Sequence, residues 1–260
     1  IININDKEID LKHGFIDNKN FFYDNIQNEF EDFVLLDTIE NCKEKLIDFL
    51  YSNDRVFCLK SSWGTGKTFH IIRTCVLKNM NNTILLVTES NALNKTLVTE
   101  LNNAILESFH NDEIASLKEK YKMSFYELYL NEMLCPRMTE KFDKLLFHSH
   151  LEFQDRKNKN INSYNKMVCS IQSIAKLKGN YDFVIIDEFE SVLNSYNNDS
   201  TFKNISNITD SYRVLEMKMQ SCIKLLCLDA DISNDKMKLL KRIMNEENLI
   251  CYKNMQRSFQ

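Results

Sequence analysis

The sequence predicts an α/β protein with a doubly wound, mostly parallel sheet, and three observations lead to this prediction. Short apolar runs of strand length recur along the chain. Most of them lack polar alternation, as expected of parallel strands that are buried on both faces. Longer amphipathic stretches separate these runs, which is the order of a strand–helix–strand fold. Only four glycines and one proline occur in 260 residues, and such sparse turn signals favour a helix-rich α/β domain.

The expected elements follow this order along the chain. A polar lead-in covers residues 1–50 and ends in a helix over 38–50, and a single lobe occupies residues 51–260. Strands are expected at residues 56–59, 84–87, 167–169, 183–186, 225–228 and 249–252, and helices at 68–80, 93–109 and 235–245. Residues from about 108 to 165 are expected to form a helical insertion between the second and third strands, ending in a polar, flexible loop.

The bulk composition excludes several classes of protein. A hydrophobic content of 43% is enough for the core of one large domain. The formal net charge of −4 argues against a wholly basic nucleic-acid binder, although a local basic groove stays possible. No apolar stretch approaches ~18 residues, and no signal peptide opens the chain. The eight cysteines lack the spacing of zinc ligands. We therefore expect a cytoplasmic or nuclear protein with buried, reduced thiols and no membrane partner.

The strongest motif is SSWGTGKT at residues 61–68, which lies between a predicted strand and a predicted helix. This is the context that a phosphate-binding loop needs, because backbone amides and the helix start point at the phosphates. We expect Lys67 to reach the β- and γ-phosphates of ATP and the Thr68 hydroxyl to bind Mg²⁺. Ser61 takes the place of the first glycine in the pattern G-x-x-x-x-G-K-[ST]. The residues expected to surround ATP are Ser62, Trp63, Gly64, Thr65, Gly66, Lys67 and Thr68.

A second motif, YDFVIIDEFE, ends an apolar strand with two acids. At the carboxyl edge of a parallel sheet such acids lie beside the phosphate loop. We expect Asp187 to hold Mg²⁺ and Glu188 to polarise the attacking water as a general base. The loop and the acid pair are independent halves of one site and would rarely occur together by chance. We therefore predict that the catalytic residues are Lys67, Asp187 and Glu188.

Three further strand ends carry polar residues. Asp229, Ala230 and Asp231 end an apolar strand where γ-phosphate binding would be coupled to movement. The other two ends are rich in hydroxyl and amide groups, which suit contacts to nucleic-acid phosphates that ignore base sequence. N-capping of the next helix is an equally good explanation of these groups. The residues expected to contact single-stranded DNA are Thr88, Glu89, Ser90, Ser170, Gln172 and Ser173.

The motifs SSWGTGKT, VTES, CSIQSI, VIIDEFESVL and LDADIS occur in this order within residues 54–231. Together they resemble the herpesvirus-type replication origin-binding proteins, which are superfamily 2 helicases, and especially the versions fused to primases in large DNA viruses. The resemblance implies a RecA-like P-loop lobe that uses ATP and Mg²⁺ to move 3′-to-5′ along single-stranded DNA during viral replication. It also implies primase or other replication proteins as partners. Ser61 and the acid Asp231 depart from the usual pattern.

The chain does not begin with Met, and no second motor lobe follows Asp231. We therefore expect a fragment whose second helicase lobe, with its arginine finger, lies outside this stretch, and which is weakly active by itself. Two alternatives stay open at this point. One is a small-molecule P-loop phosphotransferase, although the arginines are too dispersed for an arginine-rich lid. The other is a nucleotide-dependent DNA-binding module without enzymatic activity. DNA-stimulated ATP hydrolysis would separate the helicase from the phosphotransferase.

Overall fold

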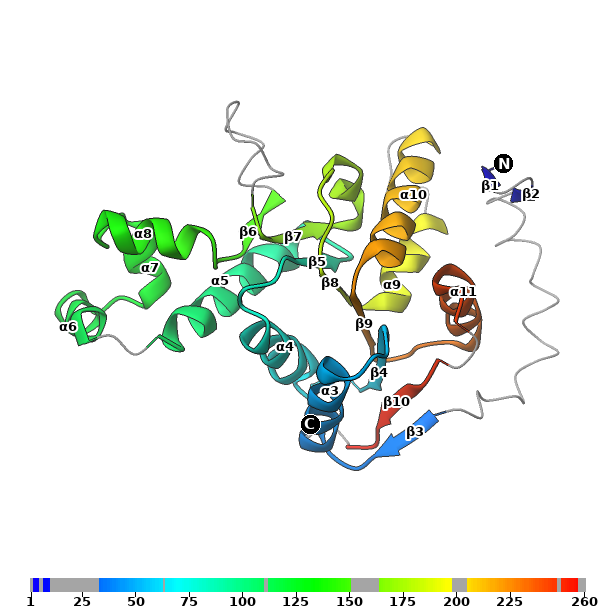
Figure 1. Cartoon of the computed structure of the whole chain (residues 1–260), viewed down its shortest axis with the longest axis horizontal. Helices are drawn as coiled ribbons and strands as arrows, with labels where there is room; N and C mark the ends of the chain where they lie inside the picture. The colour runs from blue at the N-terminus through cyan, green and yellow to red at the C-terminus, as the bar shows by residue number, and fades with distance from the viewer. Residues whose placement is uncertain are drawn as a thin grey trace.

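The computed structural model describes residues 2–4, 7–9, 33–62, 64–109, 112–150, 164–197, 205–246 and 249–256. Its main feature is one eight-stranded sheet in the order β3-β10-β4-β9-β8-β5-β7-β6 (Figure 1). Every neighbouring pair in this sheet is parallel. The predicted α/β class with a parallel sheet is therefore confirmed. A separate antiparallel pair joins β1 (Ile2–Ile4) to β2 (Lys7–Ile9).

The strands of the large sheet include all six that the sequence predicts. Their bounds are β3 Phe33–Leu36, β4 Val56–Ser61, β5 Ile84–Thr88, β6 His148–Ser149, β7 Lys166–Ser170, β8 Phe183–Asp187, β9 Lys224–Asp229 and β10 Cys251–Asn254. The last strand lies two residues later than predicted. The structure adds β3, within the expected lead-in, and β6, within the expected insertion. Both are short edge strands. β6 consists of two polar residues and gives no apolar signal, whereas β3 is the apolar run FVLL, which the prediction did not assign to a strand.

The helices and helical turns have the following bounds. They are α3 Ile39–Tyr51, the π-helical turn η1 Thr68–Ile72, α4 Arg73–Lys78, α5 Asn91–Glu107, α6 Asp112–Tyr121, α7 Phe125–Leu130, α8 Pro136–Asp143, the 3₁₀ turn η4 Ile171–Lys176, α9 Phe189–Asn194, the 3₁₀ turn η5 Ser195–Asn197, α10 Ile205–Ser221 and α11 Asn234–Met244. The four predicted helices correspond to α3, to η1 with α4, to α5 and to α11.

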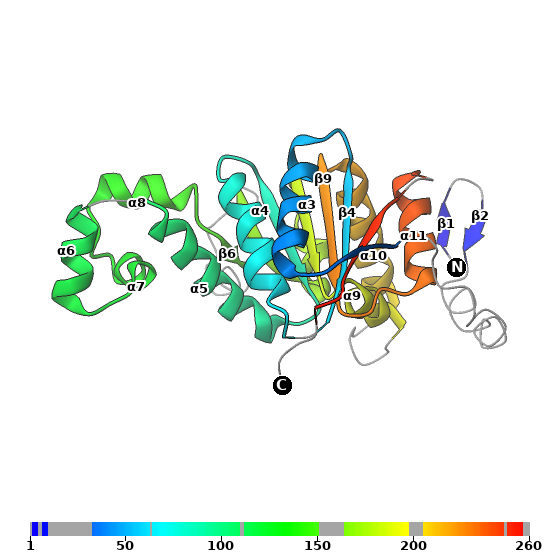
Figure 2. The same ribbon diagram turned by 90° about the horizontal axis from the view of Figure 1, so that it is seen from below.

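Helices cover both faces of the sheet, as the predicted doubly wound fold requires. Figure 2 shows α3, α4 and α5 on one side and α9, α10 and α11 on the other. Successive residues of β4 alternate between two hydrophobic clusters: Phe57 and Leu59 pack toward α3 and α4, and Val56 and Cys58 toward the opposite face. Because both faces are buried, the central strands need apolar residues at every position. This explains the missing alternation in the sequence.

Besides β6, the described part of the expected insertion contains the helices α6, α7 and α8, which stand apart from the sheet beyond α5 (Figures 1 and 2). A paired amide anchors its return to the sheet. Asn102 Nδ2 donates to the Phe147 carbonyl at 2.9 Å, and Phe147 N donates to Asn102 Oδ1 at 2.7 Å. Both groups are buried, so this exchange satisfies a backbone unit that would otherwise lack partners. The predicted flexible loop covers residues 155–166; residues 155–163 lie outside the described residues, and Lys166 begins β7.

All eight cysteines are free thiols, and all except Cys135 are buried. Cys251, Cys58 and Cys227 are neighbours on β10, β4 and β9, facing the same cluster. Burial raises the pKa of the Cys58 and Cys75 thiols, which keeps them unreactive. Among the described residues, no group of three or more His, Cys, Asp and Glu side chains is placed to hold a metal ion. No described helix is both long enough and apolar enough to cross a membrane.

Candidate functional site

The candidate site lies where three adjacent strands end. β4 leads into the phosphate loop, β8 ends at Asp187 and β9 ends at Asp229, and β9 lies between the other two. The register pairs Lys60 of β4 with Asp229, and Asp187 with Leu228 of β9. Because parallel strands end at the same edge, motifs that lie far apart in the sequence meet here.

The phosphate loop depends on its two glycines. Gly64 has φ of 74° and Gly66 has φ of 78°, a left-handed conformation that glycine adopts without the steric cost of a Cβ. A Cβ on Gly66 would also lie 2.7 Å from Cδ2 of the His70 ring. A side chain at Gly66 would therefore meet backbone strain and would also require the His70 ring to shift. Trp63, which the sequence places in this loop, lies outside the described residues.

The predicted phosphate lysine is folded into the loop. Lys67 is only 5% exposed, and its ammonium donates to the Ser61 carbonyl at 2.8 Å. The same Nζ lies 3.9 Å from Glu188 Oε1. Lys67 thus lies between the loop and the acid pair. Ser62 and Gly64 are exposed on the loop, Gly66 is half-buried and Thr65 is buried.

A π-helical turn carries the next predicted residue, Thr68. The turn η1 begins directly after Lys67, and such turns recur at functional sites because they widen the helix locally. The Thr68 hydroxyl donates to Asp187 Oδ2 at 3.1 Å, across 119 positions of sequence. This bond joins the phosphate loop directly to the acidic strand end.

The acid pair has two unusual features. Glu188 adopts φ 57° and ψ 55° as the residue before α9, a left-handed conformation that is strained for a residue with a side chain and is often found at functional sites. One oxygen of each acid, Asp187 Oδ1 and Glu188 Oε2, is buried without a hydrogen-bond partner among the described residues. A buried polar atom without a partner is costly. These two oxygens are therefore candidates to hold a ligand.

The acidic groups are poorly solvated. Burial raises the pKa of Asp187, against the opposing effects of the Thr68 hydroxyl and the Lys67 charge. Burial likewise raises the pKa of Glu188 to about 7, with Lys67 opposing the shift and Asp229 and Asp187 adding to it. A carboxyl group that titrates near neutral pH is well matched to general-base chemistry.

The third strand end, with Asp229, Ala230 and Asp231, is joined to the acid pair. Asp229 is buried, and its carboxylate accepts hydrogen bonds from Glu190 N at 2.6 Å and Asp231 N at 3.0 Å. Asp231 is exposed and pairs with Lys60 at 2.7 Å. Ala230 is half-buried between them.

Glu190 and Ser233 belong to this connection, although the sequence does not single them out as site residues. The Glu190 carboxylate accepts hydrogen bonds from Ser233 N and from Ser233 Oγ, at 3.0 Å each. Ser233 in turn caps α11. The sequence signal is slight, because an acid in the first turn of α9 and a serine before α11 are both ordinary helix-start residues. Their pairing depends on the sheet.

The six residues predicted to contact single-stranded DNA divide into two groups. Thr88, Ser170 and Ser173 are buried, whereas Glu89 and Gln172 are exposed and Ser90 is half-buried. Neither Ser90 nor Ser170 makes a side-chain capping bond to the helix that follows it. As the structure stands, only Glu89, Ser90 and Gln172 are accessible from solvent.

Asn94 of α5, which the sequence does not flag, ties these two strand ends together. In the amide orientation that satisfies every neighbour, its nitrogen donates to the Ser90 carbonyl at 3.3 Å and to Thr88 Oγ1 at 2.5 Å, and its oxygen accepts from Ser170 N at 3.2 Å. Asn94 is fully buried. It therefore holds the ends of β5 and β7 in a fixed relation.

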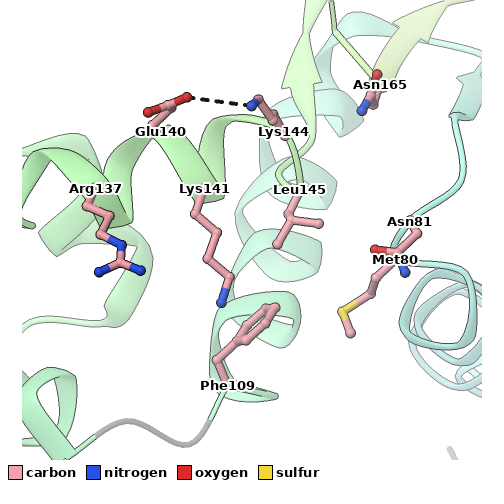
Figure 3. Close-up of a pocket in the computed structure, with 9 residues that line it drawn as sticks. All are labelled: Met80, Asn81, Phe109, Arg137, Glu140, Lys141, Lys144, Leu145 and Asn165. Carbon is pink, nitrogen blue, oxygen red and sulfur yellow. Dashed lines mark ion pairs between the residues drawn. The ribbon is translucent and has the colours of Figure 1, made fainter.

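A cavity of about 590 Å³ lies at the other end of the strands, between α8 and the segments that precede β5 and β7 (Figure 3). Lys141 extends its ammonium to 4.8 Å from the centre of the Phe109 ring, and Lys144 pairs with Glu140 at 3.6 Å. None of the predicted site residues lines this cavity. It is separate from the site at the carboxyl edge.

An all-parallel α/β sheet with a glycine loop, a buried lysine and an acid pair at its carboxyl edge defines a P-loop ATPase domain of the helicase-like superfamily 2 type. Residues 22–218 match the family described as "Type III restriction enzyme, res subunit", and the chain belongs to this family. The superfamily 2 part of the sequence resemblance is thereby confirmed. The origin-binding part stays a prediction.

Several solved structures resemble the chain at low identity. The Sulfolobus solfataricus SWI2/SNF2 ATPase core in complex with dsDNA is 14% identical, with a TM-score of 0.45 over 84% of this chain and 37% of its own. The UvsW helicase from bacteriophage T4 is 11% identical, with a TM-score of 0.42 over 81% and 57%. The DEAD-box helicase Mss116 bound to ssRNA and UDP-BeF is 14% identical, with a TM-score of 0.37 over 82% and 39%. The chain thus spans between 37% and 57% of the length of these three. No curated protein matches it.

Proposed function

We propose that this chain binds ATP with Mg²⁺ and hydrolyses it, as the first motor lobe of a helicase or translocase that acts on single-stranded DNA. The observation that carries the proposal is the bond between Thr68 and Asp187, which joins the phosphate loop to the acid pair. Lys67 and Glu188 flank that bond, 3.9 Å from each other. A phosphate loop and an acid pair that meet in this way support phosphoryl transfer to water.

Each residue has a distinct role in this proposal. Loop amides from Ser62 to Thr68, with Trp63 among them, surround the phosphates, and the Lys67 ammonium exchanges its bond to the Ser61 carbonyl for one to the β/γ-phosphates. Thr68 and Asp187 offer hydroxyl and carboxylate oxygens, the ligand type that Mg²⁺ prefers, and the unpartnered Asp187 Oδ1 fits that use. When bound, Mg²⁺ offsets negative charge on the phosphate oxygens.

Glu188 serves as the general base for the attacking water. Its unpartnered Oε2 is free to accept the water's proton, and its raised pKa, about 7, makes that transfer effective near neutral pH. Lys67 keeps part of the Glu188 population charged by its proximity. The strained backbone of Glu188 is consistent with such a role.

The connection from Glu188 to Asp229 supports coupling of hydrolysis to movement. Glu190, two residues after the base, binds Ser233, and its backbone N–H donates to Asp229. A change at the γ-phosphate would therefore reach α11 through part-buried hydrogen bonds of 2.6 to 3.0 Å. We assign Asp229, Ala230 and Asp231 to this coupling.

The nucleic-acid contacts are proposed at the ends of β5 and β7. Glu89, Ser90 and Gln172 lie there within reach of solvent, while Thr88, Ser170 and Ser173 support them from inside. The finer picture follows the sequence resemblance. It comprises a replication motor of the origin-binding type at a cytoplasmic or nuclear site. Residues 51–260 form its first lobe, to which β3 and α3 of the lead-in add an edge strand and a helix. A second lobe, primase and other replication proteins would be its partners.

Titration of the chain with a fluorescent ATP analogue and Mg²⁺ tests this function. Lys67→Ala should weaken binding by roughly 1.5–3 kcal/mol, since it removes a charge-assisted hydrogen bond to phosphate. Lys144→Ala is the matched control, because it removes a lysine at the opposite end of the strands and should leave affinity unchanged. Equal affinities for the wild type and Lys67→Ala would refute the phosphate-loop assignment. DNA-stimulated hydrolysis would further separate a motor from a small-molecule phosphotransferase.

A further inference from the structure

A chain of buried hydrogen bonds connects the last strand of the sheet to the phosphate loop. Asn254 ends β10 and is the register partner of Ser61, which ends β4. The Asn254 amide nitrogen donates to the Ser61 hydroxyl at 2.9 Å, although the two residues lie 193 positions apart. Both side chains are buried, with 4% and 1% of their surface exposed.

The direction of this hydrogen-bond chain is fixed at both ends. An amide nitrogen only donates and a carbonyl oxygen only accepts. Thr65 Oγ1 donates to the Ser62 carbonyl at 2.8 Å, so its single hydroxyl proton is used there. In the bond of 2.7 Å between the two hydroxyls, Ser61 is therefore the donor and Thr65 the acceptor. Each of the three hydrogen bonds therefore has one defined donor and one defined acceptor, and a network of this kind holds its side chains in a single arrangement.

The Asn254 amide is itself held from the other side. Its Oδ1 accepts a hydrogen bond from Gln256 N at 3.0 Å, which keeps Nδ2 directed at Ser61. Gln256 Oε1 accepts from Ile39 N at the start of α3, at 2.9 Å, and Met255 N donates to the Leu36 carbonyl at 2.7 Å. Residues 254–256 therefore join the phosphate loop to β3 and to α3.

Ser61 explains why the loop needs this support. It stands where the phosphate-loop pattern has its first glycine, so its hydroxyl is an added polar group in a buried position. A buried hydroxyl without partners is costly. Asn254 supplies the donor and Thr65 the acceptor. The Ser61 carbonyl also accepts the bond from Lys67, so Ser61 links the hydrogen-bond chain to the phosphate lysine.

We propose that Asn254 is a positioning residue for the phosphate loop, which acts through Ser61 and Thr65 and sets the affinity for the nucleotide triphosphate. This inference rests on the proposed ATP-binding function. Asn254 contacts neither phosphate nor water in the reaction. Its effect is on the shape of the loop, so it should appear in the Kd and KM for ATP and leave kcat close to the wild-type value.

A double-mutant cycle between Asn254 and Ser61 tests the inference. Asn254→Leu, similar in volume but unable to hydrogen-bond, should weaken binding of the fluorescent ATP analogue about tenfold, the equivalent of one buried hydrogen bond. In a Ser61→Gly background, which restores the usual glycine and removes the hydroxyl, the same substitution should change the Kd less than about twofold. A general structural role for Asn254 would instead give the same loss in both backgrounds.

The outcomes are separable. An unchanged Kd for Asn254→Leu, or an equal loss in the Ser61→Gly background, overturns the inference while leaving the proposed function intact. Failure of the wild type to bind the analogue overturns the proposed function itself. The unfolding temperature without nucleotide shows whether each variant is folded. If Asn254→Leu does not fold, Asn254→Asp is similar in size and keeps the acceptor for Gln256 N, but replaces the donor to Ser61 with a carboxylate oxygen. The negative charge that it adds acts on the phosphates in both backgrounds, so only the difference between the backgrounds reports the lost bond. It should weaken binding in the Ser61 background more than in the Ser61→Gly background.

Discussion

At the scale of single residues, the site combines features that lower stability with chemistry that uses them. Glu188 has a strained backbone, a buried oxygen without a partner and a raised pKa. Asp187 shares the last two features. A fold optimised only for stability would avoid such groups, and their occurrence together at one edge is typical of an active site.

The raised pKa of Glu188 predicts a dependence of stability on pH. The pKa is about 7 in the folded protein against an ordinary value of 4.5. The folded state therefore binds more protons than the unfolded state between those values, and Glu188 lowers the free energy of unfolding as pH rises through that window. Glu188→Gln removes this effect. It should raise the unfolding temperature at pH 8 and have less effect near pH 4.5. Thermal unfolding of both proteins across this range measures it, and a shift that is independent of pH would contradict the assignment.

At the scale of elements, the phosphate loop and its following π-helical turn form one unit. Gly66 has a left-handed backbone and no space for a Cβ, because the His70 ring fills that space. The His70 N–H also donates to the Gly66 carbonyl at 2.8 Å. Contacts between Gly66 and His70 thus fix both the shape of the loop and the start of the helix.

Gly66→Ala should therefore both destabilise the protein and weaken nucleotide binding. The strain of a left-handed alanine is of order 1–3 kcal/mol, and the clash with His70 adds to it. Gly179→Ala is the matched control, because a Cβ at Gly179 meets nothing within 4 Å. Denaturant unfolding and nucleotide titration of both variants make the comparison. If the two substitutions cost the same, then the loop geometry described here is wrong.

At the scale of the whole molecule, the sheet places the phosphate loop, the acid pair and the proposed nucleic-acid contacts at one edge and leaves the basic cavity beside α8 at the other. The net charge is −4, so binding to nucleic acid must come from local groups and not from overall attraction. Contacts of this kind are mostly to phosphates and ignore base sequence.

Binding of single-stranded DNA should accordingly be weak, independent of sequence and reduced by salt. Ser90→Glu and Gln172→Glu place new negative charge at the ends of β5 and β7 and should weaken it further without changing nucleotide affinity. Ser221→Glu adds the same charge at an exposed position just before β9, at the opposite edge, and should have little effect. Fluorescence anisotropy with labelled oligonucleotides at two salt concentrations tests all three. Tight binding of one defined duplex sequence would contradict the proposal.

Much of this architecture was predictable because the central strands are buried on both faces. That burial requires uninterrupted apolar runs, such as those of β5 and β8, and these runs are visible in the sequence. The phosphate loop was visible for a related reason, since the left-handed backbone at Gly64 and Gly66 favours glycine. The edge strand β3 has the same kind of apolar run, FVLL, although two of its residues are exposed, and the prediction did not assign it to a strand.

The sequence by itself therefore determined the fold class, the succession of the central elements along the chain and the main motifs that meet at the candidate site. Only the tertiary structure decided which polar groups are partners. Asn254 with Ser61, Glu190 with Ser233, and Asn94 with Thr88 and Ser170 are pairs that ordinary turn or cap residues form across the sheet edge. It also decided that three of the six proposed DNA-contact residues are buried. The physical reason is the same in each case: periodicity reports how a residue relates to its own strand or helix, whereas a hydrogen bond between strands depends on their order and register, which the packed sheet alone establishes.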